Sequence, residues 1–164
     1  MNRAIPVSRS YSGRTVDLLM FDINSDIATG PVTLSFSDNP KICTGIQKVS
    51  QIFESTLFTE LGSILADKTY GIDGVGQIGI TNVRSEYTKQ VFELAVFDSL
   101  AAMKEEQEAL AAAGTVLPLD EILTNAEILD LSVVKDKVNL NVKLTTAAGT
   151  TRVLILPTTN AMGS

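Results

Sequence analysis

The chain has 164 residues, of which 45% are hydrophobic and 20% are charged, so it can form one globular domain with a substantial core. Its 13 basic and 19 acidic side chains give a formal net charge of −6, which disfavours binding to the phosphates of a nucleic acid. The chain has no histidine and one cysteine, Cys43. This composition excludes Ser-His-Asp and Cys-His catalysis and an intrachain disulfide, and it disfavours a transition-metal site.

Two short strands are predicted near the amino terminus. Residues 15–21 are typical of a strand that is buried on both faces toward its end, and residues 31–36 alternate between apolar and polar side chains. We expect these two strands to pair as a hairpin. Residues 1–14 are polar and aperiodic. They form an arm that is either disordered or ordered only against a partner.

A helix is predicted to follow residue 44. Apolar residues at three- and four-residue spacings share one face: Ile46, Val49, Ile52, Phe53, Leu57 and Leu61. The opposite face collects polar side chains: Gln47, Lys48, Ser50, Gln51, Glu54 and Ser55. The pattern ends at Gly62 and Ser63, after which a short connection leads to Tyr70 and Gly71. We therefore expect a helix that packs one face against the core.

The glycine-rich segment 71–79 is compatible with two structures. Gly74, Gly76 and Gly79 have the spacing of a dinucleotide-binding loop, and a helix is predicted after them. However, no clear buried strand precedes them, and the Gly-Lys-Ser/Thr ending of a phosphate-binding loop is absent. The pattern favours a flexible loop between two helices over a nucleotide site.

A long helix is predicted over residues 83–113, with Thr81 or Asn82 as its amino-terminal cap. At about 1.5 Å per residue it is about 45 Å long, more than a domain of this size needs. Residues 91–97 are apolar on almost every side, with only Glu93 interrupting them. This segment is either part of an ordinary core helix, broken near Ala102, or a helix that also packs against a partner.

The carboxy-terminal part predicts an antiparallel three-stranded sheet formed by residues 128–134, 137–145 and 151–156. Residues 118–125 are predicted to form a turn or a single helical turn. The last strand is expected to end at Pro157, and residues 158–164 to form a loose tail. The fold class is therefore α+β, with an amino-terminal hairpin, two helices and a carboxy-terminal sheet, in one domain over residues 15–157.

The acidic residues offer little catalytic chemistry. Asp120 and Glu121, like Glu105 and Glu106, are adjacent in sequence, and neighbours on a helix point in different directions. Among the carboxylates, Glu93 has the most apolar sequence surroundings, which would raise its pKa. We expect no enzymatic activity, no cofactor and no metal.

The last strand offers a surface for assembly. Its only charged residue is Arg152, which is followed by four consecutive apolar residues. An exposed edge of this composition is either an aggregation hazard or a docking edge for another chain.

The order of the motifs resembles one known family. A strand with acidic residues at Asp17 and Asp22 is followed by the strand at residues 32–36, the helix at 47–57, the Thr59-to-Gly62 closure and Tyr70-Gly71. Tail-sheath initiators, the small baseplate-wedge subunits of contractile-tailed phages, have this order, and the resemblance covers roughly residues 15–157. Better-studied members carry Glu-Pro-Arg before the first strand of the carboxy-terminal sheet. This chain has Pro118-Leu119-Asp120-Glu121 there, which puts any role of that signature in doubt.

The resemblance implies a structural role. Such subunits resemble the inner domain of the sheath protein, accept arms of the first sheath ring by strand addition, and pack on wedge proteins near the tail tube or hub. Carried over, the residues that would bind the sheath arm are Val138, Leu140, Val142, Leu144, Val153, Leu154, Ile155 and Leu156. Those that would pack on wedge proteins are Phe92, Val96 and Phe97. A proline at Leu154 is then expected to block sheath attachment and leave the fold largely intact.

The resemblance also implies a place for the protein. It would be a virion component of the tail baseplate, present in several copies of a symmetric assembly, with no nucleic-acid or membrane partner. No apolar run approaches the roughly 18–20 residues of a membrane span, and the amino terminus lacks the apolar core of a signal peptide. Synthesis in a host cytoplasm is expected. The alternatives are a tail-completion or neck protein that forms its own ring, and a nucleotide-binding module that uses residues 71–79.

Overall fold

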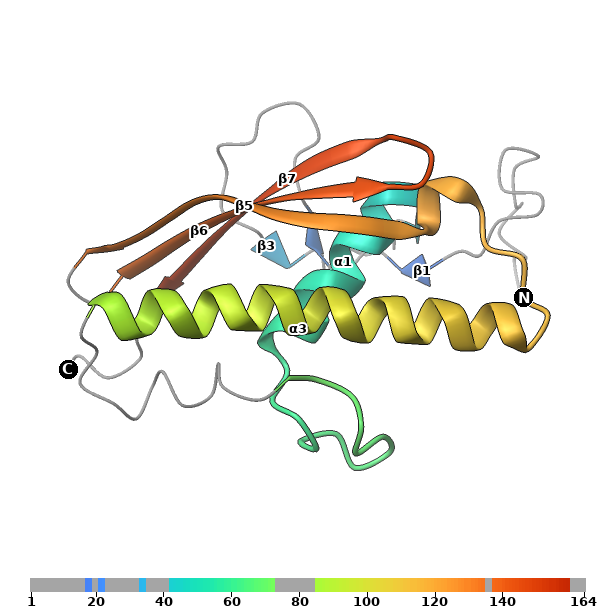
Figure 1. Cartoon of the computed structure of the whole chain (residues 1–164), viewed down its shortest axis with the longest axis horizontal. Helices are drawn as coiled ribbons and strands as arrows, with labels where there is room; N and C mark the ends of the chain where they lie inside the picture. The colour runs from blue at the N-terminus through green and yellow to red at the C-terminus, as the bar shows by residue number, and fades with distance from the viewer. Residues whose placement is uncertain are drawn as a thin grey trace, which may run out of the picture.

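The protein has an α+β fold, in which two helices lie against one face of a three-stranded antiparallel sheet (Figure 1). The computed structural model describes residues 17–18, 21–22, 33–34, 42–72, 85–134 and 137–159. The elements in chain order are β1 (Asp17–Leu18), β2 (Phe21–Asp22), β3 (Thr33–Leu34), β4 (Ile42–Cys43), α1 (Gly45–Phe58), α3 (Ser85–Ala112), the 3₁₀ turn η2 (Leu119–Glu121), β5 (Leu123–Val134), β6 (Lys137–Thr146) and β7 (Thr151–Thr159). The predicted fold class is confirmed.

The carboxy-terminal sheet has the order β5-β6-β7, with β6 in the centre. Strands β6 and β7 pair without a register shift, from Lys137 opposite Thr159 to Thr145 opposite Thr151. The turn between them is closed by the N–H of Thr146, which donates to the carbonyl of Thr150 at 3.0 Å. Gly149, at φ 77°, supplies the left-handed residue that this turn requires. The tight hairpin that the sequence predicts is therefore present.

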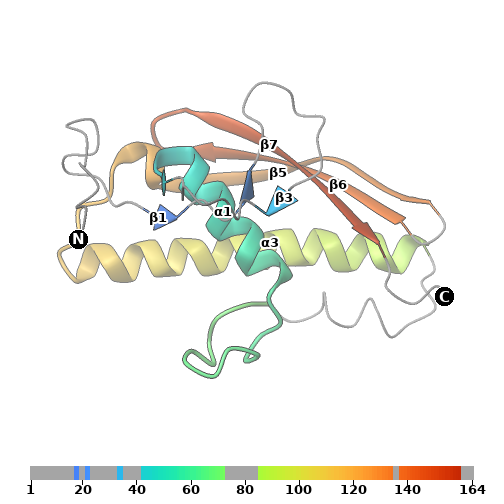
Figure 2. The same cartoon turned by 180° about the vertical axis from the view of Figure 1, so that it is seen from behind.

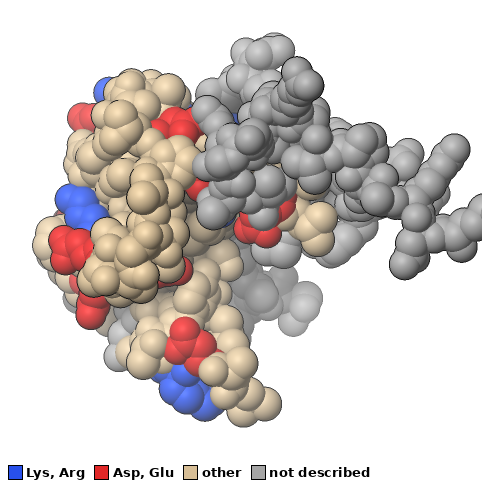
Figure 3. Space-filling view, turned by 90° about the vertical axis from the view of Figure 1, so that its right-hand side faces the viewer, with Lys and Arg blue, Asp and Glu red and all other residues tan. Residues whose placement is uncertain are grey.

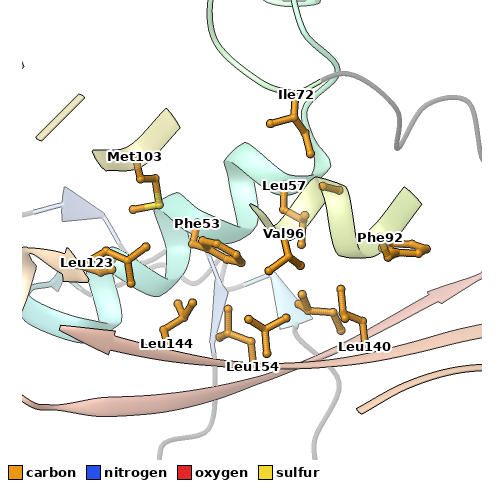
Figure 4. Packing of buried hydrophobic residues seen from close by; sticks show 14 of the residues in the cluster. Phe53, Leu57, Ile72, Phe92, Val96, Met103, Leu123, Leu140, Leu144 and Leu154 are labelled. Carbon is orange, nitrogen blue, oxygen red and sulfur yellow. The ribbon is translucent and has the colours of Figure 1, made fainter. Parts of the chain in front are cut away.

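The core lies between this sheet and the two helices, as Figure 4 shows. The alternation predicted for β6 is confirmed, since its apolar side chains all lie in the core: Val138, Leu140, Val142 and Leu144. Helix α1 contributes Val49, Phe53 and Leu57, and α3 contributes Phe92, Ala95, Val96 and Met103. Removing these side chains from water is the main favourable term for folding.

Helix α1 is buried on more sides than its sequence predicts. Ser50, Gln51 and Glu54, expected on the face opposite the apolar residues, are all buried, while Leu61 lies outside the helix and is exposed. The reason is the amino-terminal strands. The side-chain amide of Gln51 donates to the carbonyl of Leu18 at 2.8 Å, and so binds β1 to a second side of the helix.

The amino-terminal strands confirm one prediction and correct another. The predicted hairpin is present as β2 and β3, with Phe21 opposite Leu34. The single strand predicted for residues 15–21 is instead described as two strands with different partners, because β1 pairs with β4 through Asp17 and Cys43. The arm at residues 1–14 lies outside the described residues.

Three predicted boundaries change. Strand β7 continues through Pro157 to Thr159, and β5 begins at Leu123, earlier than expected. Helix α3 is continuous from Ser85 to Ala112, so the alternative of a helix broken near Ala102 is excluded. Thr81 and Asn82, the expected helix caps, and Gly74, Gly76 and Gly79 of the glycine-rich segment lie outside the described residues.

Candidate functional site

The outer edge of β7 is the first candidate assembly surface. Among the described residues, β7 pairs only with β6. In an antiparallel pair, residues that exchange hydrogen bonds with the neighbouring strand alternate with residues whose N–H and C=O point away. Counting from the bond between Thr146 and Thr150, the residues whose backbone groups point to the outer edge are Thr151, Val153 and Ile155. The position of Pro157 fits this alternation, because a proline has no N–H to give to β6.

The opposite edge of the sheet, formed by β5, is less suited to strand addition. Its pairing with β6 has two irregularities, between Leu123 and Asn125 and between Ile128 and Asp130. Bulges and charged side chains discourage another chain from extending a sheet. Strand β5 also carries the exposed residue Glu127, whose Oε2 atom lies 3.7 Å from the Nζ atom of Lys143 on β6. The regular ladder of β7 is therefore the better docking edge.

The structure distributes the predicted sheath-arm residues over two different environments. Val138, Leu140, Val142 and Leu144 lie on the central strand, which is paired on both sides, and their side chains are in the core. Strand β6 thus has no edge to offer, and these residues are corrected to core positions. Leu154 and Leu156 are also core residues. The side chains of Val153 and Ile155 are half-buried, and the backbone N–H and C=O groups of these two residues point to the outer edge of the sheet.

The expectation that a proline at Leu154 leaves the fold largely intact conflicts with the position of this residue. Leu154 lies opposite Val142, at a position whose N–H points toward β6, and its side chain is fully buried. A proline there removes a ladder hydrogen bond inside the sheet and disturbs the core. Ile155 is the position at which a proline affects the outer edge instead.

Helix α3 provides the second candidate assembly surface. Phe92 and Val96, two of the three residues expected to bind a partner, are 1% and 3% exposed and belong to the core. Phe97 is 66% exposed and Leu94 is 58% exposed. Tyr87 is also exposed and lies one heptad before Leu94. Tyr87 and Leu94 are not among the residues that the sequence predicts to bind a partner. A projection of the helix at 100° per residue places both on the side of Phe97 and could have identified them.

The loop 59–72 projects from the body of the protein below the two helices (Figures 1 and 2). Its base is closed by the N–H of Ile72, which donates to the carbonyl of Thr59 at 3.0 Å. Gly71 has φ 97°, and a Cβ there would lie 2.5 Å from that same carbonyl oxygen. Leu65, within this loop, is 90% exposed. The position of the Tyr70-Gly71 motif is thus explained by the geometry of this closure.

The carboxylates that are buried differ from the one that the sequence predicts to lie in an apolar setting. Glu93, expected in an apolar setting, is exposed. Glu54 is 6% exposed, and burial raises its pKa to about 7. Its Oε2 atom has no hydrogen-bond partner among the described residues. Glu121 is buried as well, and its Oε1 accepts the N–H of Gly45 at 3.3 Å. Both carboxylates belong to the packing of α1.

Cys43 is buried and forms no disulfide. Burial, followed by the charge of Asp17, raises the pKa of its thiol to about 11. A thiol with such a pKa is a poor nucleophile at neutral pH.

Several cavities open on α3, including two large ones. One of about 470 Å³ lies between the end of this helix and the start of β5, and its wall includes Leu117, Ile122 and Leu123. Another of about 350 Å³ lies between α3 and the loop 59–72. In the described part of the chain, no group of three or more His, Cys, Asp or Glu side chains could hold a metal ion. Neither cavity therefore has a metal-binding group of this kind among those residues.

The surface charge is mixed at the end of the molecule where α3 finishes. Figure 3 shows acidic and basic side chains interspersed there. No helix in the described ranges is long and apolar enough to cross a membrane.

The chain matches no protein-family model, no curated protein and no solved structure. The similarity to sheath initiators therefore rests on the order of the sequence motifs.

Proposed function

We propose that this protein is a structural subunit of a contractile phage baseplate that nucleates sheath assembly. In this proposal an arm of the sheath protein is added as a strand beside β7. The observation that supports it most is the regular outer edge of β7, where the backbone groups of Thr151, Val153 and Ile155 point away from β6. The motif order shared with sheath initiators supplies the identity of the partner.

Strand addition explains how such a joint would hold. The added strand would exchange backbone hydrogen bonds with β7, each contributing about 0.5–1.5 kcal/mol net. Its side chains would alternate between the core face, beside Leu154 and Leu156, and the outer face, beside Val153 and Ile155. This alternation sets the register, because a slip of one residue would move every side chain to the opposite face.

The second contact of the proposed subunit is with wedge proteins of the baseplate. With Phe92 and Val96 in the core, the surface available for this contact is centred on Phe97 and Leu94 of α3. Large exposed apolar side chains on one helix face are typical of a protein interface.

A sheath-seeding experiment tests the strand-edge proposal. Purified sheath protein is incubated with wild-type subunit and with Ile155→Pro, and polymers are counted by electron microscopy. We expect Ile155→Pro to reduce seeding by about tenfold, because it removes an outward N–H and places a ring against the incoming strand. The control, Ile155→Ala, keeps the N–H and should seed close to the wild-type level.

Two outcomes would count against the proposal. Seeding by Ile155→Pro at the wild-type level would exclude β7 as the acceptor edge. A closed ring formed by the subunit alone, indifferent to sheath protein, would favour the tail-completion or neck function.

A further inference from the structure

Helix α3 has apolar side chains on two opposite sides. Its core side carries Phe92, Val96 and Met103. With 100° between successive residues, the positions between Glu86 and Lys104 that lie farthest from that side are Gln90, Leu94, Phe97 and Ala101, which share a sector of about 60°. We call these four residues the outer stripe. Leu94 and Phe97 at its centre are more than half exposed, so the helix is prepared for packing on a second side.

We propose that the outer stripe binds the outer stripe of a second copy of this chain, with the two α3 helices antiparallel. Two-fold symmetry is the commonest way in which one surface pairs with itself. In this arrangement Leu94 packs beside Phe97 of the second copy, and Phe97 beside its Leu94. Gln90 then lies opposite Ala101, so a small side chain leaves room for a longer one at each end.

Charge complementarity supports this arrangement. With Leu94 opposite Phe97, Lys104 lies opposite Tyr87 of the second copy and beside its Glu86. Glu86 and Lys104 project from the same flank of the outer stripe, and equal flanks meet in an antiparallel two-fold pair. The dimer would therefore contain two reciprocal Glu86–Lys104 ion pairs. A parallel pair would instead place Lys104 level with Lys104 and Glu86 level with Glu86, on opposite flanks, and would contain no Glu86–Lys104 ion pair.

The side chains of Glu86 and Lys104 cannot pair with each other within one chain. They are eighteen residues apart on one continuous helix, a separation of about 27 Å. Both are exposed, and neither makes a hydrogen bond or ion pair with the described residues. Any energetic coupling between Glu86 and Lys104 must therefore act between copies.

The inference rests on the proposed function for the idea of a subunit assembly, and it assigns the α3 surface around Leu94 and Phe97 to a second copy in place of a wedge protein. It does not require β7, so the two proposals can fail separately. The first measurement is sedimentation equilibrium of the full chain between about 5 and 500 µM. We expect a monomer–dimer equilibrium, and we expect Phe97→Asp to remain a monomer because it places a carboxylate in the centre of the apolar contact.

A charge swap tests the antiparallel register. Glu86→Lys and Lys104→Glu should each weaken dimerisation by about tenfold, because each variant turns two attractive pairs into repulsive ones. The double variant Glu86→Lys/Lys104→Glu restores opposite charges and should regain wild-type affinity. Glu106→Lys, a charge change at an exposed position on the side of the same helix away from the outer stripe, is the control and should change affinity less than threefold.

A wild-type protein that stays monomeric over this range would overturn the proposal, as would a dimer that tolerates Phe97→Asp. A double variant weaker than either single variant would exclude the antiparallel register. Sheath seeding by the two variants separates the two proposals. Ile155→Pro changes the β7 edge and should reduce seeding, whereas Phe97→Asp leaves that edge unchanged and tests only the contact between copies.

Discussion

Lys48 and Glu121, far apart in sequence, form an ion pair that joins the start of α1 to the turn η2. The Nζ atom of Lys48 lies 3.1 Å from Oε2 of Glu121, whose side chain is 2% exposed. The other oxygen of Glu121 accepts the N–H of Gly45 in the first turn of α1, where a negative charge is favoured by the helix dipole. The carboxylate of Glu121 thus accepts a hydrogen bond at the start of α1, where the side chain of the N-cap residue Thr44 makes no capping hydrogen bond.

Glu121→Gln should destabilise the protein by about 1–3 kcal/mol, because it removes the buried negative charge that lies beside Lys48, while an amide oxygen can still accept the N–H of Gly45. Urea unfolding followed by circular dichroism measures the change. The matched control is Glu127→Gln, which removes the half-exposed ion pair with Lys143. It should cost less than about 1 kcal/mol. Equal effects of the two substitutions would mean that burial gives the Lys48–Glu121 pair no special weight.

The sequence could not have identified this pair, and the reason is general. Periodicity reports which side chains share a face, and it correctly located the hairpin from Val138 to Leu156 and the length of α3. It does not report how many sides of an element are covered. Ser50 and Glu54 were therefore expected on the face opposite the core, although β1 binds α1 on a second side. The distinction between Phe92 and Phe97 depended likewise on which side of α3 meets the sheet.

The closure of the loop 59–72 predicts a contrast between two glycines with similar backbone angles. Gly71→Ala places a Cβ 2.5 Å from the carbonyl oxygen of Thr59, whereas a Cβ at Gly114 meets nothing within 4 Å. We expect Gly71→Ala to cost about 2–4 kcal/mol and Gly114→Ala about 1 kcal/mol, the latter from its positive φ alone. Thermal unfolding compares the two, and limited proteolysis checks whether the loop opens. A Gly71→Ala protein as stable as Gly114→Ala would contradict the close approach.

Glu54 should make the protein less stable as the pH rises. Burial raises its pKa in the folded state to about 7 from its ordinary value of 4.5. The unfolded chain therefore ionises first, and stability falls between about pH 4.5 and 7 and is level above that range. A shift of this size corresponds to a loss on the order of 3 kcal/mol.

Glu54→Gln should remove this part of the pH dependence and be more stable than the wild type at pH 8. Urea unfolding at pH 5, 6, 7 and 8 measures it for both proteins. Parallel stability curves for the two proteins would show that Glu54 does not titrate in this range.

The inner and outer edges of β7 predict losses of stability of different size for prolines at two adjacent positions. Leu154 directs its N–H toward β6 and its side chain into the core, whereas Ile155 directs its N–H to the outer edge. Leu154→Pro should lose about 3 kcal/mol or more, through a missing ladder bond and a disturbed core. Ile155→Pro should lose about 1 kcal/mol, because edge strands accept proline where the N–H faces outward. Urea unfolding of both variants, beside Leu154→Ala and Ile155→Ala, separates the backbone effect from the loss of the side chain. If Ile155→Pro unfolded the protein as Leu154→Pro does, the backbone of Ile155 would be required by a neighbour within the chain, and the outer edge of β7 would not be available to a sheath arm.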